Sequence, residues 1–274
     1  MHFLLNALRG ALIGMAELVP GISGGTVALI VGIYERALRN ANDLISGRFK
    51  KVEWSFLAAI AVGMLAAVFG ASSILHSFVE NQVSASRALF MGMVTVSIVV
   101  PVLMMSTKFR APNIIAFLVA AAAVFFITGY TSTPVENPPL YVVFLAAMVA
   151  ICALILPGIS GSLILLTLGL YQYVIGAVSD RNMLTLGVFA LGALCGLALF
   201  VKALNYLLDN HRDATLAAMA GFMVGSLRAL WPWGDHQDAS TPTILLLFLL
   251  GAAIVGIFVY FDARKSHAYE EKHA

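Results

Sequence analysis

The sequence predicts an all-α integral membrane protein in which two inverted halves form one helical bundle. Hydrophobic residues make up 61% of the 274 residues and charged residues only 11%, which is too apolar a composition for a soluble fold. Long apolar segments recur along the chain, and a seven-residue motif rich in glycine and serine occurs twice inside them. The composition indicates the class of protein, the segments indicate its helices, and the repeated motif indicates two halves.

Six apolar segments approach or exceed the roughly 20 residues that a helix needs to cross about 30 Å of hydrocarbon. They are continuous runs of Ala, Leu, Val, Ile, Phe and Gly, unlike the alternating strands of about ten residues in a membrane β-barrel. The segments occupy residues 54–79, 88–106, 112–131, 184–208, 214–231 and 243–261. We therefore predict six full crossings.

The repeated motif reads PGISGGT at residues 20–26 and PGISGSL at residues 157–163, 137 positions apart. Proline and glycine interrupt helices, and hydrocarbon cannot satisfy an interrupted backbone. Such a break is tolerated only where protein covers it or where it lines a wet cavity. A pair of breaks at corresponding positions of two halves is the best pointer in a sequence to the binding site of a transporter.

The similarity between the two copies extends beyond the motif and divides the chain at residues 1–135 and 136–274. Residues 92–98 also resemble residues 221–227. The aligned residues that follow the motif are Leu29 with Leu166, Gly32 with Gly169 and Tyr34 with Tyr171. Each half consists of a motif-bearing hairpin followed by three spans. The hairpins occupy residues 4–38 and 140–178.

The shorter arms of these hairpins have about 15 residues and reach only about 22 Å, which suits a re-entrant hairpin better than a crossing. Charge placement favours the same model. If each hairpin enters and leaves on one side, one membrane face receives most of the cations: Arg9, Arg36, Arg39, Arg48, Lys50, Lys51, Lys108, Arg110, Lys202, Arg212, Arg264, Lys265 and Lys272. The other face receives Arg87, Arg181 and Arg228.

If each hairpin crossed once, the 16 cations would divide nine to seven and leave no positive-inside signal. The hairpin model therefore gives each half an odd number of crossings, so the two halves have opposite orientations in the membrane. Inverted repeats of this kind are typical of secondary transporters. Both termini are expected to be cytoplasmic, with the two hairpins meeting near the midplane.

A new helix is expected to begin after Ser23 and after Ser160, and the first amides of a helix have no acceptor within it. Together with hydroxyl donors and the helix dipole, these amides predict an anion site for phosphate or carboxylate. The predicted phosphate-binding residues are Ser23, Gly24, Gly25, Thr26, Ser160, Gly161 and Ser162. The alternative is structural, because glycine permits close helix packing and serine caps helices.

Two charged residues near the predicted site have a functional and a structural interpretation each. Glu17 precedes the first motif, and an acid within the membrane is a candidate for proton or cation coupling. Its alternative role is a hydrogen bond to the neighbouring hairpin. Arg228 lies at the outer end of a span beside Trp231 and Trp233. Its guanidinium could bind a phosphate headgroup or anchor the chain at the interface.

The sequence does not predict an enzyme, because no histidine falls inside either motif or deep in a span to activate a nucleophile. It contains no nucleotide-binding loop and no pair of metal ligands. We therefore expect no catalytic residue, no cofactor, no metal and no nucleic acid partner. The sequence leaves open whether the protein forms a homodimer.

The motif segments AELVPGISGGT at residues 16–26 and LPGISGS at residues 156–162 resemble the polyprenyl-phosphate transporter family of bacteria and archaea. This family includes undecaprenyl phosphate translocases. The segments GIYE at residues 32–35, GLY at residues 169–171 and GSLRALWPW at residues 225–233 also resemble that family. The resemblance covers essentially the whole chain.

The resemblance implies a translocase of the bacterial cytoplasmic (inner) membrane that returns undecaprenyl phosphate, a polyprenyl phosphate lipid, from the outer to the inner leaflet. This transport would recycle the carrier lipid of peptidoglycan and other cell-envelope polymers. The motif residues would hold the phosphate, with help from Arg228. The main alternative is a small-anion channel or an ion-coupled anion transporter, and a further one is a scaffold without transport activity.

Overall fold

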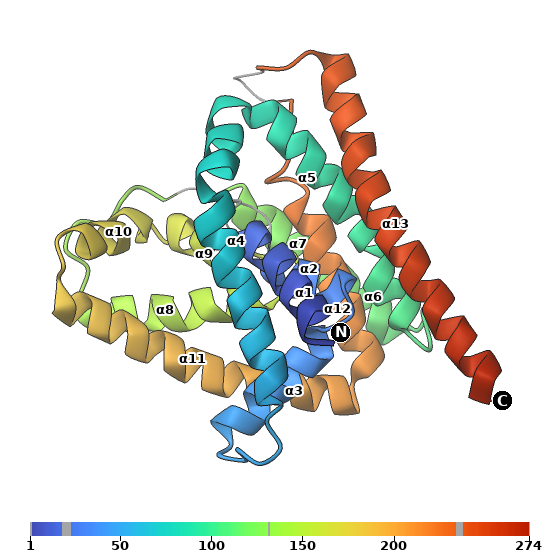
Figure 1. Cartoon of the computed structure of the whole chain (residues 1–274). Helices are drawn as coiled ribbons and strands as arrows, with labels where there is room; N and C mark the ends of the chain where they lie inside the picture. The colour runs from blue at the N-terminus through green and yellow to red at the C-terminus, as the bar shows by residue number, and fades with distance from the viewer. Residues whose placement is uncertain (1, 18–22, 131, 234–237, 274) are drawn as a thin grey trace.

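The computed structural model of the chain describes residues 2–17, 23–130, 132–233 and 238–273 (Figure 1). Within these ranges the chain is helical and contains no strand, as the composition predicts. The helices are α1 (His2–Glu17), α2 (Gly24–Ile30), α3 (Tyr34–Ile45), α4 (Trp54–Asn81), α5 (Val83–Ser97), α6 (Val99–Met104), α7 (Ala111–Thr128), α8 (Leu140–Ile155), α9 (Gly161–Thr167), α10 (Tyr171–Ser179), α11 (Met183–Asn210), α12 (Arg212–Ser226) and α13 (Thr241–His273).

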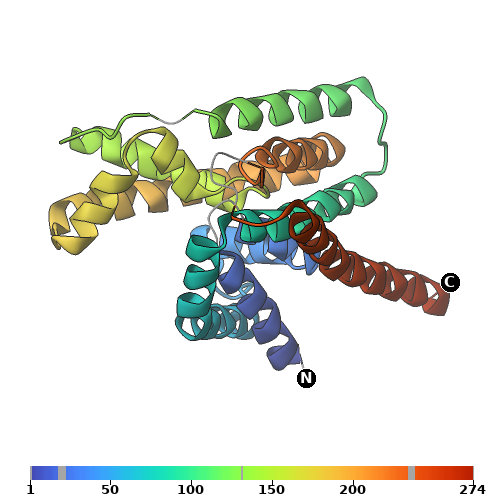
Figure 2. The same ribbon diagram turned by 90° about the horizontal axis from the view of Figure 1, so that it is seen from above.

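Four long helix pairs organise the bundle. α1 packs along α4 and α8 packs along α11, so each predicted half pairs its first hairpin arm with its first span (Figure 1). The other two pairs exchange partners, because α5 lies along α13 and α12 lies along α7 (Figure 2). Each exchanged pair joins the second predicted span of one half to the third span of the other. Equivalent helices of the two halves therefore make equivalent contacts.

Glycines allow the exchanged pairs to approach closely. A Cβ atom on Gly92 of α5 would lie 2.0 Å from the carbonyl oxygen of Phe248 on α13. A Cβ atom on Gly221 of α12 would lie 2.3 Å from the carbonyl oxygen of Phe117 on α7. Because lipid removes most of the hydrophobic drive between helices, close backbone packing contributes much of their association. Gly92 and Gly221 occupy the same place in the two aligned segments, so one residue type makes one contact twice.

A core of buried apolar side chains joins the two halves. It includes Ile33 and Phe56 from the first half and Leu204 and Met223 from the second, each at most 2% exposed. Many large apolar side chains on the outer faces of the long helices are exposed instead, such as Phe126, which is 70% exposed. This arrangement suits a bundle whose surroundings are apolar.

Three helical segments are long and apolar enough to cross a membrane by themselves. They are Val83–Met104, Ala111–Thr128 and Met183–Asn210, and the bent pair α9 and α10 would be a fourth if it forms one span. The six predicted crossings therefore remain a prediction for the other segments. The protein is a multi-pass membrane protein in which the described helices match most of the predicted segments to within a few residues.

The predicted span 214–231 is wrong as a single helix. α12 ends at Ser226, whose hydroxyl donates a hydrogen bond to the Met223 carbonyl at 2.8 Å. The chain then continues in tight turns, in which the amide of Leu230 reaches the carbonyl only three residues earlier, at 3.2 Å. Pro232 cannot continue a helix, because it lacks an amide proton and clashes with the preceding turn. The apolar composition of the segment concealed this change of geometry.

The second arm of each predicted hairpin is also not a single helix. α2 and α3 are separated at Gly32, and α9 and α10 are separated at Gly169. Both glycines have a φ of +71°, a conformation that glycine adopts without the penalty that a side chain would meet. The break between α9 and α10 bends the chain by 110°, so residues 160–178 cannot span as one rod. The turn of the first hairpin, residues 18–22, lies outside the described residues.

Contacts between loops join segments that the charge pattern predicts to share a membrane face. Arg212 lies 2.6 Å from Glu35, and Asp213 accepts a hydrogen bond from the Ser106 amide at 2.9 Å. These residues all belong to segments assigned to the more cationic face. On the other side, the Ser84 amide donates to Asp238 at 2.9 Å, and both of these segments were assigned to the less cationic face.

Candidate functional site

The two copies of the motif begin their helices with the same backbone geometry. Ser23 is the N-cap of α2 with φ −101° and ψ 130°, and Ser160 is the N-cap of α9 with φ −100° and ψ 132°. An extended N-cap of this kind leaves its side chain free to accept a hydrogen bond from the first turn. The sequence repeat is therefore also a structural repeat from these serines onward.

The two motifs lie directly against each other in the centre of the bundle. The Ser23 hydroxyl lies 3.0 Å from the Leu156 carbonyl oxygen and 3.3 Å from that of Leu154, to which it donates. The Gly158 amide donates to the Thr26 hydroxyl at 2.9 Å. Ser23 and Thr26 are 1% and 2% exposed. Buried hydroxyls of one motif thus satisfy the interrupted backbone of the other.

Gly25 brings the two backbones into contact at this point. A Cβ atom built on Gly25 would lie 2.5 Å from the Ile155 carbonyl oxygen. This is the structural role that the sequence offered as the alternative for the motif glycines. Close packing is not the only role open to the motif, because its hydroxyl groups lie at the same place.

The prediction that the first motif presents free amides is wrong in this structure. The Gly24 amide donates to a carboxylate oxygen of Glu17 at 2.9 Å, and the Gly25 amide donates to the Ser23 hydroxyl at 3.1 Å. The Thr26 amide donates to the Ser23 carbonyl at 2.9 Å. Glu17 thus places an anionic group at the position where a bound anion was expected, while much of its side chain is exposed.

The second motif is more open. The Ser160 and Ser162 hydroxyls lie 2.8 Å apart and share one hydrogen bond, and Ser160 makes no side-chain cap. Within the described part of the chain, no acceptor faces the amides of Gly161 and Ser162. Ser162 is exposed, whereas Ser160 is 8% exposed. Hydroxyl and amide donors are therefore present here without an internal carboxylate like Glu17.

The helix dipole contributes less to this site than the sequence argument assumed. α2 and α9 have seven residues each, because the glycines at positive φ end them after two turns. A macrodipole is a sum over aligned peptide units, so a helix of this length carries a weak one. The hydroxyls and the individual amides are the groups that remain to bind an anion.

Arg228 contacts α7 in this structure. Its guanidinium donates to the Phe125 carbonyl at 2.9 Å and lies 4.5 Å from the centre of the Phe125 ring. The arginine is exposed and follows the C-terminal end of α12. These contacts tie the end of α12 to α7.

The structure adds a residue that sequence reasoning did not place in the site. Tyr34, at the start of α3, donates a hydrogen bond from its hydroxyl to the Ile155 carbonyl at 3.1 Å and is 6% exposed. The alignment of Tyr34 with Tyr171 was visible in the sequence, but only the fold shows that Tyr34 returns to the second motif. The neutral phenol is the donor here.

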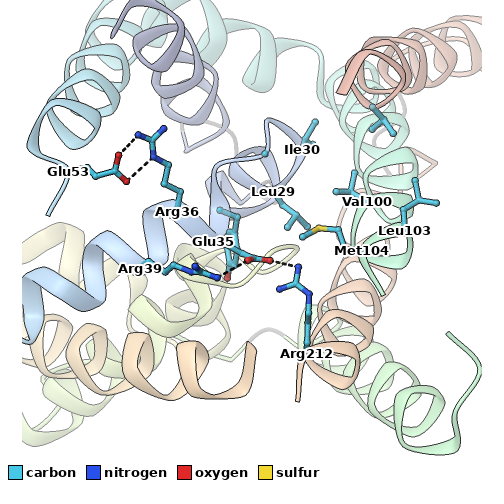
Figure 3. A pocket seen from close by; sticks show the side chains of 13 residues that line it. Leu29, Ile30, Glu35, Arg36, Arg39, Glu53, Val100, Leu103, Met104 and Arg212 are labelled. Carbon is cyan, nitrogen blue, oxygen red and sulfur yellow. Dashed lines mark hydrogen bonds and ion pairs between the residues drawn. The ribbon is translucent and has the colours of Figure 1, made fainter. Parts of the chain in front are cut away.

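Tyr34 also lines a cavity with a volume of about 900 Å³. The cavity lies between α2, α3, α6, α13 and the start of α12. Figure 3 shows Arg36 beside Glu53, and Glu35 between Arg39 and Arg212. The charge pattern placed these arginines on the more cationic membrane face and did not predict that they share a cavity. Only the fold brings Arg212 to α3.

Fold and site together define a helical multi-pass membrane protein whose two copies of a broken-helix motif meet inside the bundle. The chain matches the family model VCA0040-like: Undecaprenyl phosphate translocase-like over residues 13–245, and it belongs to that family. The resemblance drawn from the motifs is thereby confirmed.

Two relatives are similar over most of their length. The chain is 32% identical over 249 residues to the polyprenyl-phosphate transporter of Vibrio cholerae, a match that covers 86% of this chain and 80% of the relative. It is also 32% identical over 265 residues to the polyprenyl-phosphate transporter of Staphylococcus aureus, with 90% and 93% covered. No solved structure matches the chain.

Proposed function

We propose that the protein transports polyprenyl phosphate, and that it returns undecaprenyl phosphate from the outer to the inner leaflet of the bacterial cytoplasmic membrane. The names of both relatives support the lipid phosphate as the substrate. The transport is a translocation without covalent chemistry, so no catalytic residue and no cofactor take part. The step would recycle the lipid carrier of cell-envelope synthesis.

The observation that carries this proposal is the direct contact between the two motifs inside the bundle. The Ser23 hydroxyl reaches the Leu156 carbonyl, and the Gly158 amide reaches the Thr26 hydroxyl. A phosphate crosses a low-dielectric region only if fixed donors replace its water. The proposed donors are the hydroxyls and amides of Ser23, Gly24, Gly25, Thr26, Ser160, Gly161 and Ser162. The isoprenoid tail stays in the bilayer beside the protein.

The exchanged helix pairs support the proposal of two inverted repeats. α5 contacts α13 and α7 contacts α12, so each half holds the other through equivalent helices. Rocking of one repeat against the other would open the motif pair to each leaflet in turn. In this scheme both termini are cytoplasmic, and the faces of the membrane follow from the excess of cations on one side.

Glu17 is the proposed coupling residue. Its carboxylate accepts a hydrogen bond from the Gly24 amide at 2.9 Å. A bound phosphate would compete with this carboxylate for the same donor. Protonation or binding of a cation would weaken this contact, because a neutral carboxyl is a poorer acceptor than a carboxylate. Phosphate would first reach the open serines of the second motif and then displace Glu17 from the first.

A leaflet assay with purified protein in vesicles tests the site. Fluorescent polyprenyl phosphate is placed in the outer leaflet, and its return is followed by a membrane-impermeant quencher. The double substitution of Ser23→Ala with Ser160→Ala is expected to slow return at least about tenfold, since each lost charge-assisted hydrogen bond contributes about 1.5 kcal/mol or more. Ser179→Ala is the control, because Ser179 is exposed and bonds only locally, to Ile175.

Unfolding measurements separate the site from its scaffold. Ser23→Ala removes a cap and the donor to the Leu154 and Leu156 carbonyls, so it is expected to lower the free energy of unfolding by about 2–4 kcal/mol. Ser160→Ala removes no cap, so its effect on translocation should exceed its effect on stability. Unimpaired return in the folded double variant would refute the site, and equal flux of inorganic phosphate without any polyprenyl lipid would favour an anion channel instead.

A further inference from the structure

The cavity beside α3 combines a cationic side with an apolar side. Its charged wall consists of Arg36, Arg39 and Arg212 with two carboxylates, Glu35 and Glu53, which leaves one positive charge in excess. Its apolar wall comes from α2, α6 and α13, as Figure 3 shows for the first two. The apolar residues are Leu29, Ile30, Val100, Leu103, Met104 and Val259. A ligand that fills both sides has an anionic head and a hydrocarbon tail.

The three arginines are not equally available to such a ligand. Arg36 is held by Glu53, to which its Nε donates at 3.0 Å, and its guanidinium lies 4.2 Å from the centre of the Phe56 ring. Arg39 and Arg212 have no such cage in the described residues and converge on Glu35 at 3.6 Å and 2.6 Å. These two guanidiniums form the cationic pair that a phosphate can reach.

Glu35 occupies the place of an anion between this pair, but its fit is incomplete. Its side chain is 25% exposed, and its Oε1 atom is buried without a hydrogen bond of good geometry from any described residue. Arg212 forms an ion pair with that oxygen, with its Nη2 atom 2.6 Å away. A phosphate has three oxygens and accepts paired hydrogen bonds from a guanidinium fork, which a carboxylate in this position does not.

The cavity is connected to the motif through α2. This helix has seven residues, Gly24–Ile30, and is therefore about 10 Å long. Thr26 near its beginning contacts the second motif, and Leu29 and Ile30 at its end line the cavity. Tyr34 lines the cavity and also bonds to Ile155 before the second motif. A headgroup that leaves the motif would therefore meet Arg39 and Arg212 as the next cationic groups.

We propose that the cavity is a second binding site for a phosphate monoester with an apolar tail. Arg39 and Arg212 bind the phosphate, and Glu35 is the internal carboxylate that the phosphate displaces. The tail begins against the apolar residues of α6 and α13. The lining of the cavity supports binding by itself. The role of the cavity as a transport site on the more cationic face rests on the proposed function.

Direct binding to the purified full-length protein in detergent tests this site. Farnesyl phosphate is the probe. Farnesol, which lacks the phosphate, and inorganic phosphate, which lacks the apolar tail, are the comparison ligands. We expect farnesyl phosphate to bind at least about tenfold more tightly than either, because both walls contribute. Equal affinity for inorganic phosphate would overturn the lipid assignment in favour of a free-phosphate site.

Three variants test the assigned residues, and one serves as a matched control. Arg39→Gln and Arg212→Gln should each weaken binding of farnesyl phosphate about tenfold or more, which corresponds to about 1.4 kcal/mol. Glu35→Gln should tighten binding, since it removes the competing anion. Arg48→Gln removes the same charge at a similarly exposed residue that pairs with Asp43, and it should leave binding unchanged.

The sign of the Glu35→Gln effect distinguishes displacement from scaffolding. If Glu35 only positions the arginines, Glu35→Gln will weaken binding, and that result overturns the proposal even if an arginine variant fails to fold. The Ser160→Ala variant should still bind farnesyl phosphate in the cavity, whether or not the variant transports polyprenyl phosphate. If Arg39→Gln loses binding but translocates at the same rate, the cavity has no role in transport, and the proposed function stays intact.

Discussion

Replacing Gly25 by alanine tests whether contact between the two motifs holds the bundle together. The new Cβ would lie 2.5 Å from the Ile155 carbonyl oxygen. Ordinary van der Waals contact begins at about 3.4 Å, so the motifs must separate by about 0.9 Å. The Ser23 hydroxyl, now 3.0 Å from the Leu156 carbonyl, would then approach or exceed the limit of a hydrogen bond.

The expected cost follows from these two effects. Overpacking a close contact costs about 1–3 kcal/mol, and a weakened hydrogen bond costs about 1 kcal/mol more. Gly25→Ala should therefore lower the free energy of unfolding by about 2–4 kcal/mol, offset slightly by the better helix propensity of alanine. Denaturation in mixed detergent micelles, followed by circular dichroism, measures this difference.

Gly187→Ala is the matched control for Gly25→Ala. It makes the same substitution inside α11, where a Cβ atom would meet nothing within 4 Å. It should leave stability unchanged or raise it by up to about 1 kcal/mol. If Gly25→Ala is as stable as wild type and translocates at the same rate, the two motifs do not depend on backbone contact, and the reasoning fails.

Three further predictions concern single side chains. Thr26→Val removes the acceptor of the buried Gly158 amide and should lower the free energy of unfolding by about 1–3 kcal/mol. Hydrogen bonds from an arginine and an asparagine hold the pKa of Glu53 below its usual range, so the stability it contributes is present above pH 4.5 and is lost as the pH falls through the lowered pKa. Arg228→Gln should destabilise the α12–α7 contact at Phe125 and reduce translocation only in proportion to that loss.

Each of these predictions has its own control. Thr128→Val should change little, because Thr128 is only half-buried and its hydroxyl bonds only locally, to the Phe125 carbonyl. In thermal unfolding across pH, the difference between wild type and Glu53→Gln should be constant near neutrality and shrink below about pH 4.5; a difference that grows in acid contradicts the ion pair. A fully stable Arg228→Gln protein that no longer transports would show that Arg228 acts on the substrate.

The sequence predicted the parts of the site that depend on local backbone preference. Proline and glycine marked both breaks, and new helices were predicted to begin directly after Ser23 and Ser160, which the structure shows as their N-caps. The same reasoning missed the sharp bend that follows, although Gly32 and Gly169 were aligned. A glycine permits a positive φ but does not require one, so packing decides whether the bend forms.

The sequence could not predict which residues the site residues contact. Glu17 accepts from the Gly24 amide only because the end of α1 lies near the start of α2, so this predicted amide is not free. Arg212 meets Glu35 across the bundle, although 177 positions separate them in the sequence. Local pattern gives no information about contacts of this range, because each contact depends on how all the intervening helices pack.

By itself, the sequence determined that the chain is a helical membrane protein with a duplicated, interrupted motif, because partition into lipid and the breaking of helices depend on residue type and spacing. Only the tertiary structure decided that the two motifs satisfy each other, that a carboxylate occupies the first, and that arginines from both halves line one cavity. These features are set by pairwise distances between remote residues, which arise when the helices pack and not before.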